Sequence, residues 1–457
     1  MSASLSEPRY HHWPENCATQ QLSSPLVNVP PVNFQRVAVL AAIIGASFFL
    51  CEHSLQVALA DAYTQTADEM QATAGGGNTL RRLVFLALGM LGGLLLVGSK
   101  TKLHINLLMI GSIGCFFAIC YASYFWAIDP SMALRRLIVL SCVIVGSLGL
   151  ARYLNLRELA LLSLLITVAL SSFGVLNELR LGTFRPWSGD FRFAGTVHPN
   201  TQGMILAVQI FSAAALWPAT KSGQLRSWIV AAGMAGLLLL VLTKSRTSTA
   251  AVLVSLLAIL LLQTKFSTKL LGGLAIAWCG AASLLLLWLT GIDPKKDFRD
   301  AVLLGRAEES DTLSGRHLIW PEMWDHIAQR PLLGHGFESF WTADNIDSVS
   351  ETLQWGVREA HNGYLDVMLS VGQVGLLLGV VMAFIGLWSS ARGYLQLRDS
   401  SYALPFGLIV FALLNSFLES GMVNIMLGTF LLGSYLLHIG LFAEPTTERK
   451  APSSSAH

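Results

Sequence analysis

Charged residues are scarce in this sequence. Of its 457 residues only 13% are Asp, Glu, Lys or Arg, while 53% are apolar, and the mean hydropathy is +0.56. Soluble domains average about 25% charged residues, so the composition excludes an ordinary soluble protein and predicts one built into a membrane. The net charge of +2 indicates little, because the distribution of charge between loops matters more in such a protein. We expect a lipid bilayer as a partner and no nucleic acid.

Residues that could hold a metal ion or a disulfide framework are also few. None of the six cysteines lies between Gly291 and Asn362. The 11 histidines are scattered, without HExxH or paired-ligand spacing. The glycine run at residues 75–77 lacks the context of a phosphate-binding loop. We therefore expect no metal site and no cofactor.

Long apolar runs are what the sequence has in abundance. About 12 of them approach the length needed to cross roughly 30 Å of hydrocarbon. They cover residues 37–59, 83–98, 103–126, 137–151, 159–176, 202–217, 228–243, 247–263, 270–290, 364–388, 402–418 and 421–442. The predicted fold class is an all-α polytopic membrane protein with about 12 transmembrane helices and one large extracytoplasmic loop that contains short helices.

The domain order follows from these runs. Residues 1–36 are polar and should form a flexible cytoplasmic tail. An uncleaved first span explains the next run better than a signal peptide, because this leader is too long for one. Nine transmembrane helices in 37–290, a cap loop in 291–362, three helices in 363–442 and a cytoplasmic tail in 443–457 complete the order.

The cap loop, residues 291–362, has a helical pattern of its own. The pattern opens at Arg316 and is interrupted by Pro321, which should kink the helix or mark its first turn. It stops at Arg330-Pro331, before Gly334-His335-Gly336. The residues expected on one apolar face are Ile319, Trp320, Met323, Trp324 and Ile327.

Basic pairs recur in every second loop. The pairs are Lys100/Lys102, Arg152/Arg157, Lys221/Arg226, Lys265/Lys269 and Arg392/Arg398. The positive-inside rule places these loops and both termini in the cytoplasm. The cap loop then faces outward and is the expected place for chemistry.

The outward loops should be poor in basic residues, yet they contain many. The set comprises Arg81, Arg82, Arg135, Arg136, Arg180, Arg185, Arg192, Lys244 and Arg246. Any single one can be explained by snorkelling or by pairing with a loop carboxylate. As a set they favour an anionic ligand at the outer interface, because a guanidinium donates two parallel hydrogen bonds to phosphate.

His361 is the candidate base. It lies just before an apolar span, where helix-terminal amides disfavour imidazolium and favour the neutral ring. A capping or surface histidine is the alternative on spacing alone. Glu359 and Asp366 flank it and could orient the ring or could merely be interface residues.

Several motifs resemble the O-antigen ligase and Wzy-type polymerase superfamily of bacterial envelope glycosyltransferases. They are Ser314-Gly315-Arg316 followed by Trp320, Arg330-Pro331-Leu332-Leu333-Gly334-His335-Gly336, and Ala360-His361-Asn362-Gly363-Tyr364-Leu365 followed by Gly372. Phe337-Glu338-Ser339-Phe340-Trp341 is most similar to the exopolysaccharide-production branch. The resemblance implies action on glycans carried by polyprenyl diphosphate, without a metal and with inversion at the anomeric centre.

Residue roles carry over at matching positions. The resemblance implies that His361 is the catalytic base and that Arg246 and Arg316 bind the diphosphate. Arg192 and Arg136 are further candidate ligands of the diphosphate or substrate. The candidate supporting residues are Asn362, Trp320 and Glu419.

The function expected is polymerisation of lipid-linked repeat units into exopolysaccharide or O-antigen at the bacterial inner membrane. The partners are then a polyprenyl-diphosphate-linked oligosaccharide, a glycan acceptor and other polysaccharide assembly proteins. Ligation of a finished glycan to lipid A-core, and transfer to protein, are the alternative acceptors.

Two further alternatives come from other classes. A transporter or flippase predicts related halves, but no repeat is evident. A metal-dependent glycosyltransferase could use Asp61, Asp68 or Glu69, and the His and Arg pattern disfavours it.

The alternating basic pairs predict which loops a membrane-impermeant thiol reagent reaches. In a background without native cysteines, Ser348→Cys should be labelled in intact spheroplasts and Ser222→Cys should not. Permeabilised spheroplasts, where both sites are accessible, provide the control. The reverse pattern in intact spheroplasts would contradict the outward assignment of the cap loop.

Overall fold

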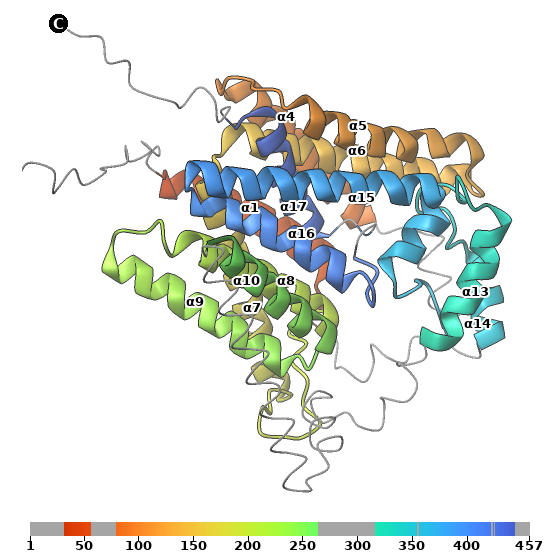
Figure 1. Cartoon of the computed structure of the whole chain (residues 1–457). Coiled ribbons are helices and arrows are strands. Elements are labelled where there is room, and N and C mark those ends of the chain that lie inside the picture. Colours follow the sequence, from red (N-terminus) through yellow and green to blue (C-terminus); the bar gives the residue numbers. More distant parts are fainter. Residues whose placement is uncertain are drawn as a thin grey trace, which may run out of the picture. The chain divides into compact units, whose positions relative to one another are not determined.

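The computed structural model describes residues 32–55, 79–263, 316–353, 356–421, 424 and 426–443. Within these residues the regular elements are all helices, and from Asn33 on they belong to one compact unit. Figure 1 shows α1 (Phe34–Glu52), α4 (Thr79–Gly98), α5 (Leu107–Ala122), η1 (Ser123–Trp126), α6 (Pro130–Tyr153), α7 (Leu156–Leu181), α8 (Pro199–Leu216), α9 (Gly223–Leu242), α10 (Arg246–Gln263), α13 (Arg316–Gln329), α14 (Ala343–Leu353), α15 (Gly363–Leu397), η4 (Ser400–Tyr402), α16 (Ala403–Asn415) and α17 (Leu427–Leu441).

The helices agree with the predicted apolar runs. Each run coincides with a described helix except 270–290, which lies outside the described residues. By length and composition, 7 helices could cross a membrane, and α10, α16 and α17 are shorter apolar helices. The all-helical membrane fold is therefore confirmed, while about 12 crossings and the loop arrangement stay predictions.

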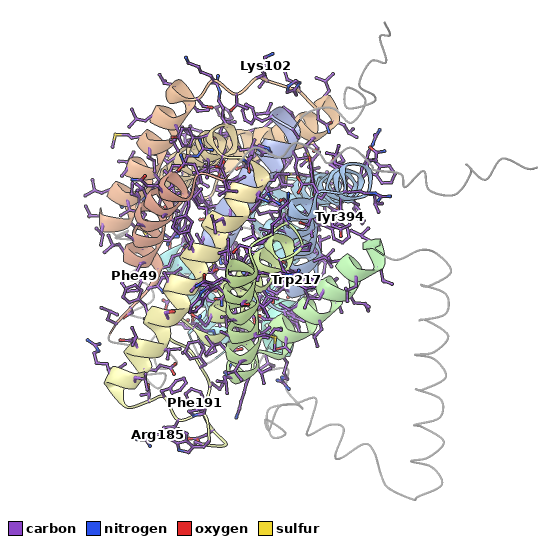
Figure 2. All side chains as sticks on the ribbon, turned by 90° about the vertical axis from the view of Figure 1, so that its left-hand side faces the viewer. Phe49, Lys102, Arg185, Phe191, Trp217 and Tyr394 are labelled. Carbon is purple, nitrogen blue, oxygen red and sulfur yellow. The ribbon has the colours of Figure 1, made fainter. Side chains whose placement is uncertain are left out.

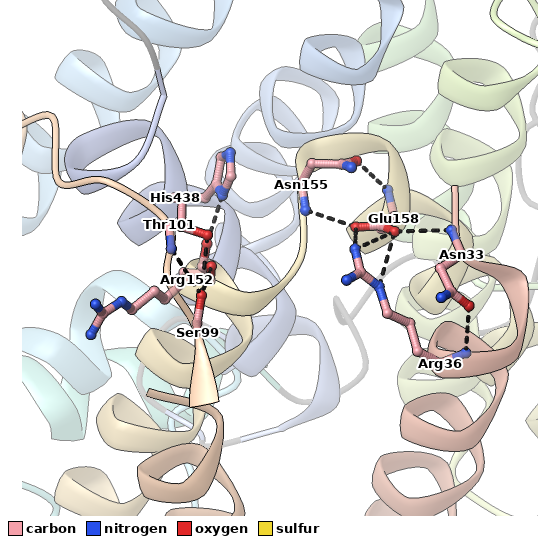
Figure 3. Close-up of polar contacts among 9 residues, drawn as sticks. Asn33, Arg36, Ser99, Thr101, Arg152, Asn155, Glu158 and His438 are labelled. Carbon is pink, nitrogen blue, oxygen red and sulfur yellow. Dashed lines mark hydrogen bonds and ion pairs between the residues drawn. The ribbon is translucent and has the colours of Figure 1, made fainter. Parts of the chain in front are cut away.

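Polar contacts gather four of the five loops that carry basic pairs at one end of the bundle, here called the basic end, and Figure 3 shows part of it. The fifth pair, Lys265/Lys269, lies outside the described residues. Arg36 at the start of α1 donates from Nη2 to both carboxylate oxygens of Glu158, at 2.6 and 2.5 Å. Glu158 is fully buried and also belongs to the capping box that Asn155 forms at the start of α7. A buried carboxylate that lost such a partner would destabilise the fold by several kcal/mol (about 3–5).

Other contacts bring further loops to the basic end. The hydroxyl of Ser99 donates to the carbonyl of Arg152 at 2.9 Å, as Figure 3 shows. Arg157 donates to the carbonyl of Ala219, and Ser400 donates to that of Ala215. The predicted inner loops at 98–106, 152–157, 216–222 and 398–402 thus lie together.

The opposite end carries the cap, with α13 and α14, and the turns that precede α6 and α15. Ile319, Met323 and Ile327 of α13 are buried in one apolar cluster with Leu365 and Leu369 of α15. This confirms that the cap has an apolar underside facing the membrane helices.

The structure contradicts the prediction for Trp324, agrees with it for Trp320, and shows where Pro321 lies. Trp324 is 51% exposed, because it follows the buried Met323 by one residue and so points about 100° away. Trp320 is half-buried, and its indole Nε1 donates to the carbonyl of Ala360 at 3.2 Å. Pro321 lies inside α13, beyond its first turn.

Helix α15 is broken at Gly372, where the backbone has φ 69° and ψ −172°. In an unbroken helix the amides of Gln373 and Val374 would donate to the carbonyls of Leu369 and Ser370. Here those two amides donate instead to the carbonyls of Pro331 and Leu332, at 2.9 and 3.2 Å. The motif after α13 therefore inserts its backbone into the break.

The same motif satisfies the carbonyls that the break leaves. The amide of His335 donates to the carbonyl of Leu369 at 2.7 Å, and that of Gly336 donates to Ser370 at 2.9 Å. These two amides and two carbonyls of α15 thus have partners across the break, which an apolar environment requires. We call this arrangement of residues 331–336 and 369–374 the α15 joint.

The α15 joint needs glycine at two positions. A Cβ on Gly372 would lie 2.1 Å from the carbonyl oxygen of Leu332, and one on Gly334 would lie 2.7 Å from the amide of Gly372. Both residues also have positive φ. The backbone of Gly372 lies in a region that is essentially restricted to glycine.

Gly372→Ala should therefore lower the free energy of unfolding by at least about 1–3 kcal/mol and lower the Tm in detergent. Gly93→Ala in α4 is the matched control, since a Cβ there meets nothing within 4 Å and alanine favours helix. Thermal unfolding of both variants tests the joint. Equal Tm values for the two variants would show that the break does not depend on glycine.

Candidate functional site

A cavity of about 760 Å³ lies at the cap end of the bundle. Its walls come from the end of α1, the starts of α4 and α6, the segment after α13 and the turn before α15. The charged residues and histidine that line it are Glu52, Arg81, Arg82, Arg135, Arg136, His198, Glu338, Arg358, Glu359 and Asp366.

The arginines come from two helix starts that the fold sets together. Arg81 and Arg82 follow the first residue of α4 closely, and Arg135 and Arg136 lie in the second turn of α6. Asp129 caps α6 by accepting from two backbone amides, and these bonds hold the pKa of its carboxyl below the ordinary value. Helix starts and guanidinium groups both favour an anion.

Glu338 faces the arginines from the cap side. Its Oε2 lies 3.3 Å from Nη1 of Arg136. Burial raises the pKa of the Glu338 carboxyl, although Arg136 opposes the change. The backbone of Glu338 has φ +47°, and its amide donates to the hydroxyl of Ser370 at 2.9 Å. Such strain in a residue that is not glycine often marks a functional position.

His361 contacts the cavity wall through Glu359. Its Nδ1 lies 3.1 Å from Oε1 of Glu359, and its backbone has φ +49°. Burial raises the pKa of Glu359, but the hydrogen bond to His361 and the charges of His361, Arg358 and His198 together outweigh burial and leave this pKa below the ordinary value. A carboxylate at Nδ1 favours the tautomer with the proton on Nδ1, which makes Nε2 the basic nitrogen.

Asn362 fixes the turn that carries His361. Its side-chain oxygen accepts from the amides of Tyr364 and Leu365, at 3.0 and 3.2 Å, and so caps α15. Asn capping is worth about 1 kcal/mol. Asn362 therefore fixes the turn that carries His361.

A second set of hydrogen-bonded polar residues, Arg192, Asn200 and Glu419, contacts this turn. Arg192 donates to the carbonyl of Thr243 at 3.2 Å and to Asn200 at 3.4 Å. Asn200 in turn donates to Oε1 of the buried Glu419 at 2.7 Å. The amide of Gly363 donates to the carbonyl of Glu419 at 3.0 Å, so the turn from Glu359 to Gly363 links the cavity to this group.

The remaining candidate ligands are placed only in part. Arg246 is half-buried at the start of α10, between Ser245 and Ser248, and the latter hydroxyl donates to Asn415 at 3.3 Å. Arg316 begins α13, but its side chain lies outside the described residues. Neither Arg246 nor Arg192 lines the cavity, whereas Arg136 does.

Some of the outward basic residues have structural contacts. Arg180 donates to the carbonyl of Leu55 at 2.6 Å, Arg185 donates to that of Gly182 at 3.2 Å, and Lys244 donates to that of Gly189. Figure 2 shows Arg185 beside Phe191 at the edge of the bundle opposite Lys102. For these residues the structural explanation suffices.

The part of the chain that the structure describes contains no group of three or more His, Cys, Asp or Glu residues that could hold a metal. The sequence had singled out neither Glu338 as an ion-pair partner nor Glu52 and His198 as wall residues. Their positions depend on contacts far apart in the sequence, and no local spacing signals them.

The chain is similar to known proteins over most of its length. Residues 229–380 match the family model described as Wzy_C, O-antigen ligase, and this segment contains Arg246, Arg316 and His361. The chain is also 26% identical over 348 residues, 72% of this chain and 75% of the relative, to the exopolysaccharide production protein ExoQ of Rhizobium meliloti (strain 1021). These findings confirm the resemblance to the O-antigen ligase superfamily and to its exopolysaccharide branch.

The cavity predicts binding of a diphosphate that depends on Arg136 and is opposed by Glu338. Arg136→Gln should weaken binding of farnesyl diphosphate, by about 10-fold for one charge-assisted contact. Glu338→Gln should strengthen it, because the carboxylate no longer competes for the guanidinium. Calorimetric titration in detergent measures both, with Arg185→Gln, outside the cavity, as the control. Unchanged affinity in both cavity variants would exclude this site for the diphosphate.

Proposed function

We propose that this protein is a membrane glycosyltransferase that transfers glycan from a polyprenyl-diphosphate-linked donor and thereby extends an exopolysaccharide. The observation that carries the proposal is the pair of His361 and Glu359 at the wall of an arginine-lined cavity. The similarity to an O-antigen ligase model and to an exopolysaccharide production protein supports a role in polysaccharide assembly.

The residues suggest a single displacement. Nε2 of His361 takes the proton of an acceptor hydroxyl while the hydroxyl oxygen attacks the anomeric carbon of the donor. The bond from that carbon to the diphosphate oxygen breaks, and the electron pair leaves with the diphosphate. Attack opposite the leaving group inverts the anomeric centre. Glu359 keeps the imidazole in the tautomer that the step needs and stabilises the imidazolium that forms.

Arginines stabilise the charge that grows on the leaving diphosphate. The geometry of the cavity favours Arg136 and the other arginines of its wall for this role. The resemblance to the family favours Arg246 and Arg316 instead. Arg246 does not line the cavity, and the side chain of Arg316 lies outside the described residues. No proton has to reach the leaving group, because a diphosphate is a good leaving group. In this proposal the arginines, rather than a metal ion, supply the positive charge at the diphosphate.

The acceptor distinguishes polymerase from ligase. The similarity to an exopolysaccharide production protein favours polymerase, whereas the family model carries the name of the ligase. In a deletion strain, loss of secreted polymer with intact lipopolysaccharide supports polymerase. Free lipid-linked polymer together with bare core would instead identify a ligase. For both acceptors we propose that the cap lies on the outer face of the inner membrane.

Substituting the proposed base should affect the transfer rate, whereas substituting a proposed phosphate ligand should affect both donor binding and the transfer rate. His361→Ala should lower the transfer rate by about 10²- to 10⁴-fold with donor binding nearly unchanged. Arg246→Lys keeps the charge but loses the planar fork, so donor affinity should fall along with turnover. Transfer and donor binding are measured separately in detergent with lipid-linked donor, and His104→Ala at the basic end is the control. If His361→Ala transferred glycan at the rate of the unmodified protein, His361 would be excluded as the base.

The ion pair predicts a shift in the pH profile. Activity should fall as the pH decreases through the histidine range, near about 6.5, because His361 must be neutral to accept a proton. A nearby carboxylate favours imidazolium, so Glu359→Gln should move this acid limb to lower pH. Rate against pH for both proteins tests the pair. An acid limb at the same pH in Glu359→Gln would show that Glu359 does not act on the base.

A further inference from the structure

Arginines line one part of the cavity wall, whereas the part next to the proposed base carries two carboxylic acids and a tryptophan. We infer that Trp341, Glu359 and Asp366 form the binding site for the terminal sugar of the acceptor, and that this site selects a sugar without negative charge. The inference rests on the proposed function, because it assigns one substrate of that reaction to one wall of the cavity.

Asp366 organises the cavity wall beside the proposed base. The residue is 9% exposed and lines the cavity wall. Its Oδ1 accepts from the indole Nε1 of Trp341 at 3.3 Å and from the amide of Ala360 at 3.2 Å. Its side chain also interacts with the hydroxyl of Ser420, and Oδ2 itself is buried. The carboxyl group therefore fixes the indole of Trp341 and the backbone of Ala360 at the cavity wall beside His361.

Trp341 supplies the apolar part of the site. Its indole lines the cavity and is half-buried against Phe340, with ring centroids 5.1 Å apart. The bond from Nε1 to Asp366 fixes the orientation of the ring. An aromatic face beside carboxylate oxygens suits a sugar, which offers an apolar ring face and hydroxyl donors.

The position next to His361 assigns this wall to the acceptor. The base must lie within hydrogen-bond reach of the hydroxyl that it deprotonates, and His361 contacts Glu359 of this wall directly. Carboxylates repel phosphate, so the donor diphosphate belongs at Arg81, Arg135 and Arg136 rather than here.

The same charges set the specificity. Glu359 carries negative charge, since contact with His361 keeps the pKa of its carboxyl below the ordinary value. A uronic acid or a sugar with an acidic substituent at the acceptor terminus would add a further anion. Arg358 is exposed on the same segment and also lines the cavity. A neutral or amino sugar therefore fits the wall beside the base.

Asp366→Asn is the sharpest test. The amide oxygen can keep the bonds to Trp341 and Ala360, while the amide nitrogen can accept a hydrogen bond neither from Ser420 nor from a sugar hydroxyl. The KM for a lipid-linked acceptor ending in glucose should rise about 10-fold, and the KM for the donor should stay within about twofold. Asp325→Asn, exposed on α13, is the control. An unchanged acceptor KM would overturn the site.

Trp341 variants and a charged acceptor provide a second test if Asp366→Asn does not fold. Trp341→Ala should raise the acceptor KM more than Trp341→Phe, which retains an aromatic face. The unmodified protein should use the matched acceptor ending in glucuronic acid at least about 10-fold less efficiently than the glucose acceptor. Equal use of the two acceptors would overturn the selectivity. If the purified protein transfers glycan to no acceptor, the proposed function itself fails.

Discussion

The break in α15 at Gly372 is the constraint on which the rest of the site depends. Backbone groups freed within an apolar bundle must find partners, and residues 331–336 supply them. This fixes the segment that leads from α13 to Glu338. It also isolates the first turns of α15, whose cap is Asn362 and whose residues Asp366 and Ser370 line the cavity.

The α15 joint also reaches the arginines. The amide of Ile128 donates to the carbonyl of His335 at 2.9 Å, and the indole Nε1 of Trp126 donates to that of Leu333 at 2.9 Å. The segment just before α6 is therefore tied to the cap, and α6 carries Arg135 and Arg136. The proposed base, the carboxylates and the guanidinium groups are thus positioned by one hydrogen-bonded framework, which is the kind of support that precise catalytic geometry needs.

Sequence reasoning succeeded where local patterns decide the structure. Apolar runs predicted the helices, and alternating basic pairs grouped loops that contact one another at the basic end. It did not separate the outward arginines into those that bind carbonyls, such as Arg180, and those that line the cavity, such as Arg136. That distinction arises from helix packing. Likewise Gly372 was noted only as a motif residue, because the broken helix is visible only through its partner segment.

The central claim is that the donor diphosphate lies in the cavity with its anomeric carbon facing the wall beside His361. A cryo-EM structure of the full chain with a donor analogue whose glycosidic oxygen is replaced by a methylene group tests this directly. The account predicts phosphate density within hydrogen-bond distance of Arg136 and the reducing sugar turned toward Glu359 and His361. Phosphate density held by Arg192 and Arg246 with the cavity unoccupied would contradict it.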